Sequence, residues 1–86
     1  MQKVYKYVLD FDDYCNVILP VGYKLLDVKV QNGNPVLWAL VNPNEIHSKI
    51  VRFRIAGTGH PIEENELGYV ATFEYNELIF HVFSIL

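Results

Sequence analysis

The chain has 86 residues, of which 51% are hydrophobic and 20% are charged, and its formal net charge is −3. This length allows a single domain, 1–86, with one core, and the composition excludes an intrinsically disordered chain. The negative charge argues against nucleic-acid partners and anionic membranes. The single cysteine, Cys15, excludes a disulfide framework and a cysteine-based zinc site within one chain.

The ends of the sequence carry no targeting signal. Residues 1–6 lack the apolar core of a signal peptide. No segment approaches the roughly 18 consecutive apolar residues of a membrane-spanning helix. We therefore expect a cytoplasmic protein that has no membrane partner.

Polar and apolar residues alternate with period two along most of the chain, which predicts strands. In chain order, the first four strands are expected at 3–9, 14–19, 25–31 and 36–42. Asn32-Gly33 separates the third from the fourth, and both residues tolerate the positive φ angles of a type I′ hairpin turn. A two-residue loop there places Val28 opposite Leu37 and Asp27 opposite Trp38.

The second half of the chain continues this pattern. Three more strands are expected at 50–56, 68–75 and 78–85, with at most one short helical turn near 62–67. A loop at Asn76-Glu77 pairs Phe73 with Phe80 and Thr72 with His81. Seven short strands predict an all-β fold, either a compact antiparallel sandwich or a small open barrel, whose strand order stays open.

Several expected strands carry apolar residues on both faces, most clearly 36–41 and 78–85. A sandwich buries one face of each sheet, so this excess predicts a partner, most simply a homo-oligomer. A monomer with scattered exposed apolar side chains is the alternative. The uncharged end of the last strand, 84–86, is the edge that we expect to pair between subunits.

One polar loop has the composition of a ligand site. In Gly57-Thr58-Gly59-His60-Pro61, the two glycines allow backbone N–H groups to converge on an anion. Arg52 and Arg54 precede the loop on one strand face and suit a phosphate-containing small molecule, and Trp38 suits a stacked base. The candidate ligand-binding residues are Trp38, Arg52, Arg54, Gly57, Thr58, Gly59 and His60. The alternatives are a tight turn for the loop, a solvated strand face for the arginines and a core or interface position for Trp38.

Catalytic and metal-binding patterns are not found. His47, His60 and His81 are too far apart in sequence for a local metal motif, and we expect His81 to be a packing residue that faces Thr72. His60 lies beside Thr58, but no carboxylate is placed by sequence to orient it. We therefore expect no catalytic residues, no metal, no cofactor and no enzymatic activity.

Several segments together carry a family resemblance. They are Leu-Trp-Ala-Leu-Val at 37–41, Gly-Thr-Gly-His-Pro-Ile at 57–62, the opening strand at 3–7, the Leu-Pro step at 19–20 and the aromatic-His-Val-Phe strand at 80–83. With these segments the chain resembles an uncharacterised family of short phage and prophage proteins. The resemblance implies a phage origin and action in the host bacterial cytoplasm, and it carries no activity.

Small phage proteins without catalytic machinery are often counter-defence factors. We therefore expect a non-catalytic binding protein that sequesters a host nucleotide-derived immune signal or docks on a host defence protein. Two alternatives stay open. One is a phage structural or assembly module without a small-molecule ligand, and the other is a small hydrolase that uses His60 and Thr58.

Overall fold

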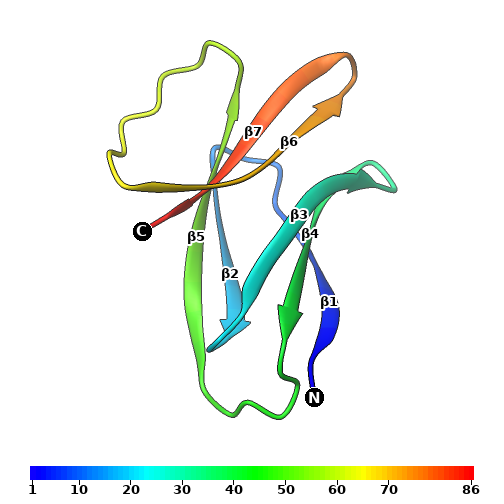
Figure 1. Ribbon diagram of the computed structural model, residues 1–86. Helices are drawn as coiled ribbons and strands as arrows, with labels where there is room; N and C mark the ends of the chain where they lie inside the picture. The colour runs from blue at the N-terminus through cyan, green and yellow to red at the C-terminus, as the bar shows by residue number, and fades with distance from the viewer.

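The computed structural model describes all residues, 1–86, and shows seven antiparallel strands without a helix (Figure 1). The strands are β1 (Lys3–Val8), β2 (Tyr14–Pro20), β3 (Lys24–Gln31), β4 (Asn34–Val41), β5 (Ser48–Gly57), β6 (Leu67–Tyr75) and β7 (Leu78–Ile85). The all-β prediction is confirmed. The helical turn allowed near 62–67 does not form, because residues 61–66 make an irregular loop and Leu67 already pairs in β6. The chain has no helix long and apolar enough to span a membrane.

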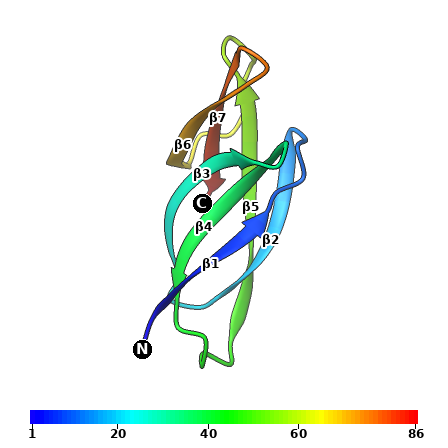
Figure 2. The ribbon, with the colours of Figure 1, turned by 90° about the vertical axis from the view of Figure 1, so that its right-hand side faces the viewer.

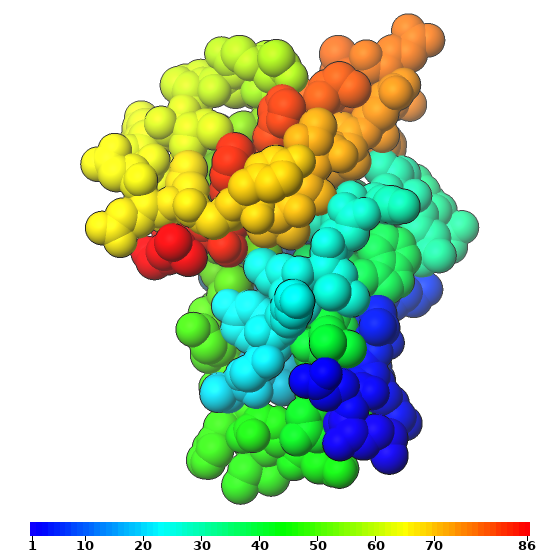
Figure 3. Space-filling model, in the orientation of Figure 1, coloured from blue at the N-terminus to red at the C-terminus, as the bar shows by residue number.

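The strands form two sheets, in the orders β1-β4-β3 and β2-β5-β7-β6. The sheets pack face to face as a sandwich and do not close into a barrel; Figure 2 looks onto the smaller sheet, with β5 passing behind it and most of β6 and β7 extending above it. At one side of the sandwich β3 lies beside β6, visible as the cyan and gold segments of Figure 3. The edge strands are therefore β1 and β3 in one sheet and β2 and β6 in the other.

The C-terminal strand is not an edge. β7 pairs with β5 on one side and with β6 on the other, so the prediction that 84–86 ends a free edge is wrong. The physical reason is that a strand paired on both sides needs no charged residue to protect its backbone. The absence of charge in this segment therefore reflects an interior position.

Both predicted two-residue hairpins are confirmed. Asn32 and Gly33 have φ angles of 53° and 79°, and Val28 faces Leu37 as Asp27 faces Trp38. At the second hairpin, Asn76 and Glu77 have φ angles of 49° and 67°. Phe73 there pairs with Phe80 and Thr72 with His81. Local turn chemistry thus sets the register of β3–β4 and β6–β7.

A single hydrophobic core fills the space between the sheets. In β2, alternate residues Cys15, Val17 and Leu19 are buried, and the residues between them are polar or exposed. Phe53 of β5 lies at the centre of this core and is fully buried. The remaining core residues are Leu9, Val28, Leu37, Val51, Ile55, Ala71, Phe73 and Val82.

Substitutions at two turn positions should change the free energy of unfolding in opposite directions. Gly33→Ala should lower the free energy of unfolding by about 1–2 kcal/mol, because an L side chain is strained at positive φ. A Cβ at this position meets no atom within 4 Å, so the loss is conformational. Glu77→Gly should raise the free energy of unfolding by up to about 1 kcal/mol for the same reason. Urea denaturation of both variants measures the two shifts, and equal signs would contradict this account.

Candidate functional site

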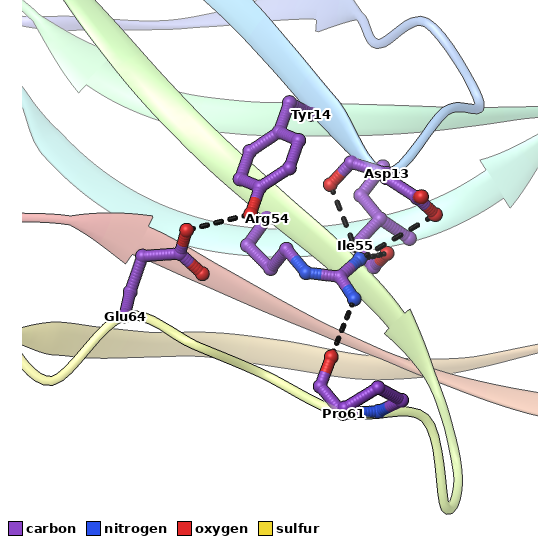
Figure 4. Close-up of polar contacts among 6 residues, drawn as sticks. All are labelled: Asp13, Tyr14, Arg54, Ile55, Pro61 and Glu64. Carbon is purple, nitrogen blue, oxygen red and sulfur yellow. Dashed lines mark hydrogen bonds and ion pairs between the residues drawn. The ribbon is translucent and has the colours of Figure 1, made fainter.

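Arg54, an expected ligand-binding residue, is buried, with 6% of its surface exposed. Its guanidinium donates hydrogen bonds to the main-chain oxygens of Asp13 at 3.3 Å, Pro61 at 3.0 Å and Ile55 (Figure 4). Its Nη1 also lies 3.6 Å from the Asp13 carboxylate. One side chain thus joins the loop before β2, strand β5 and the loop after β5. These contacts satisfy a buried charge and leave Arg54 poorly placed to bind a ligand.

A second contact holds down the same loop. The Tyr14 hydroxyl donates to Glu64 Oε2 at 2.6 Å, and the Tyr14 ring faces the guanidinium of Arg52, whose Cζ lies 4.2 Å from the ring centroid. The hydrogen bond to the Glu64 carboxylate raises the pKa of Tyr14, and it lowers the pKa of Glu64 from its ordinary value. Arg52 itself is exposed. Sequence reasoning missed Glu64, because nothing local pairs it with a residue 50 positions earlier.

The glycine loop is built as a tight turn. The His60 N–H donates to Gly57 O at 3.0 Å, and Gly59 has a φ of 89°. The Thr58 N–H donates to Ile79 O at 3.2 Å. Two of the three amides at 58–60 are therefore used by the fold, which weakens the case for an anion nest in this loop.

The cavity beside the glycine loop has acidic walls. It measures about 550 Å³ and is lined by Asp12 and Asp13 together with His60 and the aromatic rings of Phe11, Tyr14 and Phe80. The Asp13 side chain is 81% exposed. Two carboxylates repel a phosphate, and the buried Arg54 offsets one of them at most. This geometry favours neither the phosphate ligand nor the nucleotide.

Trp38 lies away from the glycine loop. It belongs to β4, on the face of the smaller sheet that points away from the core, where it lines a groove with Val4 and Leu26. The glycine loop lies instead on the larger sheet, where the Thr58 N–H donates to Ile79 O of β7. The structure therefore brings Arg52, Arg54 and the residues 57–60 into one region, and it does not bring Trp38 there.

The structure places Thr58 next to His81. Thr58 Oγ1 lies 2.8 Å from His81 Nε2 and 3.3 Å from Ile79 O. On the other side, His81 Nδ1 lies 3.1 Å from Thr72 Oγ1, which in turn lies 2.8 Å from the Tyr69 hydroxyl. Both ring nitrogens of His81 thus contact hydroxyl groups, and neither contacts a carboxylate that would orient the ring as a general base. The chain of contacts joins β6, β7 and the glycine loop.

The remaining candidates for chemistry are also engaged or separate. No group of three or more His, Cys, Asp or Glu side chains converges as a metal site. The Cys15 thiol is buried, and burial raises its pKa, which disfavours the reactive thiolate. Asp10 N–H donates to Cys15 Sγ at 3.3 Å. Cys15 is therefore a small core residue in this fold.

Comparison with known proteins gives one match. A family model described as a domain of unknown function, DUF7352, matches residues 1–85. No curated protein and no solved structure matches the chain. The expectation of an uncharacterised family is thus confirmed, and the phage origin stays a prediction. Because the family has no assigned activity, function has to be argued from the geometry.

The structural role of Arg54 has a matched control in Arg52, two residues earlier on the same strand. Arg54→Met should lower the free energy of unfolding by at least about 2 kcal/mol, because one buried and two partly buried main-chain oxygens lose a charged donor. Arg52→Met should lower it by no more than about 1 kcal/mol, because this side chain is exposed. Chemical denaturation of both variants makes the comparison. Equal stability of the two variants would contradict the role assigned to Arg54.

The Tyr14–Glu64 contact should give stability a defined pH dependence. Because the pKa of Glu64 is lowered in the folded state, the contact stabilises the fold above the ordinary carboxyl pKa of about 4.3 and is lost as the pH falls through the lower folded value. Because the pKa of Tyr14 is raised, the contact is also lost as the pH rises above about 10. The stability difference between wild type and Tyr14→Phe should therefore be present at neutral pH and shrink in acid. Tyr69→Phe is the control, since its hydroxyl contacts Thr72, and a Tyr14→Phe difference that is constant with pH would refute the assignment.

Proposed function

The chain belongs to the DUF7352 family, a domain of unknown function, and from this premise we propose that it is a non-catalytic binding protein that docks on another protein. The proposal rests on one surface, the outer face of the β1-β4-β3 sheet. Of the two modes of action expected from sequence, the geometry favours docking over sequestration of a nucleotide. The resemblance to phage proteins makes a host defence protein the candidate partner.

The docking surface has an apolar centre. Its members share the outward side of the smaller sheet: Val4 and Val8 from β1, Leu26 from β3, and Trp38 and Leu40 from β4. We call this surface the Trp38 face. Val4 is 53% exposed and Val8 is 64% exposed, and a groove of about 360 Å³ lies between Val4, Leu26 and Trp38. A Trp beside exposed aliphatic side chains is the composition of a protein-binding hot spot.

Charged residues surround this centre with an excess of one sign. The register places Lys6, Lys24 and Lys29 on the same side as Trp38, against one carboxylate, Asp27. Three lysines and one aspartate give this face a positive balance, although the whole chain carries a net charge of −3. This positive charge balance favours a partner with an acidic surface and disfavours the pairing of two copies through this face.

The glycine-loop region supports the same choice by elimination. Its buried arginine is occupied by main-chain oxygens, and its cavity is lined by Asp12 and Asp13. A sequestered nucleotide would need several unoccupied cations at that position, and Arg52 is the only exposed arginine there. Hydrolysis by Thr58 would need an oriented base, but His60 makes no hydrogen bond to Thr58, and His81 contacts the hydroxyls of Thr58 and Thr72 without a carboxylate to orient it.

The Trp38 face can be tested by capture from bacterial cells that express the tagged protein. Val4→Glu and Trp38→Ala should each reduce recovery of a stoichiometric partner by at least about tenfold, because they remove apolar contact at the centre of the face. Leu78→Glu is the matched control, since Leu78 is 61% exposed but lies on the other sheet. Recovery should also fall with added salt, as an acidic partner requires.

Two outcomes would overturn the proposal. The first is equal capture by wild type, Val4→Glu and Trp38→Ala, with native circular dichroism spectra for all three. The second is release of a stoichiometric nucleotide from the denatured wild-type protein, detected by mass spectrometry, which would establish sequestration.

A further inference from the structure

We propose that β2 is the edge through which two copies of this chain pair, with β2 of one subunit added antiparallel to β2 of the other. The pairing would join two four-stranded sheets into one continuous sheet. It uses the sheet opposite the Trp38 face and does not depend on the proposed function.

The four edge strands differ in how they are protected. An exposed strand edge pairs with other chains unless charges, bulges or prolines block it. β1 carries two lysines, β3 carries three charged residues and a bulge between Leu25 and Asp27, and β6 carries Glu74 and a bulge between Tyr69 and Ala71. β2 has no charged residue and no bulge, and its proline, Pro20, stands at the last position.

Backbone bonds at both ends of β2 fix which groups point to the free edge. The Ile55 N–H donates to Asp13 O at 3.0 Å, and the Val21 N–H donates to His47 O at 2.9 Å. Hydrogen-bonded positions alternate in an antiparallel pair, so the odd-numbered residues of β2 direct their backbone groups to β5. The even-numbered residues direct theirs outward, and those that have an N–H are Tyr14, Asn16 and Ile18.

One apolar side chain at this edge would be covered by the pairing. Ile18 is 65% exposed, whereas its partner Ile50, 67% exposed, lies one strand farther from the edge on β5. With a two-fold axis at Val17, Asn16 of each subunit faces Ile18 of the other. Each Ile18 side chain is then covered by β2 of the other subunit and loses contact with water.

The charges at the two ends of β2 favour a second copy in the antiparallel orientation. Asp10, Asp12 and Asp13 precede the strand, whereas Lys49 of β5 pairs with Leu19 near its other end. An antiparallel two-fold pair brings the acidic end of each strand to the lysine end of the other. The lysines of the Trp38 face repel a second copy there, so the β2 edge is the self-complementary surface.

The experiment follows the mass of the full chain by light scattering and sedimentation from about 1 µM to about 1 mM, because a single pair of strands makes a small interface. Wild type should reach twice the monomer mass within this range. Asn16→Pro should raise the dissociation constant of the dimer at least about tenfold, because it removes an outward N–H and leaves the bonds to β5 intact. Ile18→Lys, which adds a charge to the edge, should have the same effect and serves if the proline variant fails to fold.

Ile50→Lys is the matched control. It makes the same change on the same sheet face, one strand away from the edge, and should leave the dissociation constant within about threefold of wild type. Amide hydrogen exchange at Asn16 and Ile18 should slow as the protein concentration rises. A wild type that stays monomeric at about 1 mM, a native Asn16→Pro variant that still dimerises, or loss of the dimer in Ile50→Lys would each overturn the proposal.

Discussion

The arrangement of the larger sheet depends on the burial of one guanidinium. Arg54 holds the loop before β2 and the loop after β5 against the same strand through main-chain oxygens. Without this donor the three carbonyl groups, of which one is buried and two are partly buried, would lose their charged partner, and the loop at 58–66 would be held over β5 mainly by the Tyr14–Glu64 contact. Ala56, on the same side of β5 as Arg54, is only 1% exposed, although that side faces away from the core. The main role of the glycine-rich segment is therefore to pack over the outer face of its own sheet.

This cover makes the two sides of the sandwich unequal. The larger sheet covers part of its outer face with its own chain, through Pro61 and Glu64. The smaller sheet has no such cover, and its apolar side chains, with Trp38 among them, face outward within a ring of lysines. The high hydrophobic content of so short a chain is thus distributed over a core, a self-covered face and an uncovered face. The uncovered face is where a partner gains the most from binding.

Features set by neighbouring residues could be predicted from the sequence, and those set by distant contacts could not. Asn32-Gly33 determines one hairpin by its own backbone preferences, and Asn76-Glu77 separates two alternating segments by a two-residue loop, so the pairs around both were predictable. The order of strands was not, because an alternating pattern shows which face is buried and not which strand is adjacent. Arg54 and Arg52 have the same sequence pattern, yet only Arg54 meets the oxygens of Asp13 and Pro61. His81 was correctly paired with Thr72, but its contact with Thr58 needed the turn of the glycine loop.

The strand order also determines how the chain must reach its native state. The β3–β4 and β6–β7 hairpins close loops of two residues, which is fast and entropically inexpensive. β1–β4 and β2–β5 instead join segments separated by more than thirty residues at most positions. Most native pairing therefore waits for long loops to close, and such topologies fold in about milliseconds to seconds. Until these long loops close, the apolar faces of the β3–β4 and β6–β7 segments remain in water, so the pairing of β5 determines how long they are exposed.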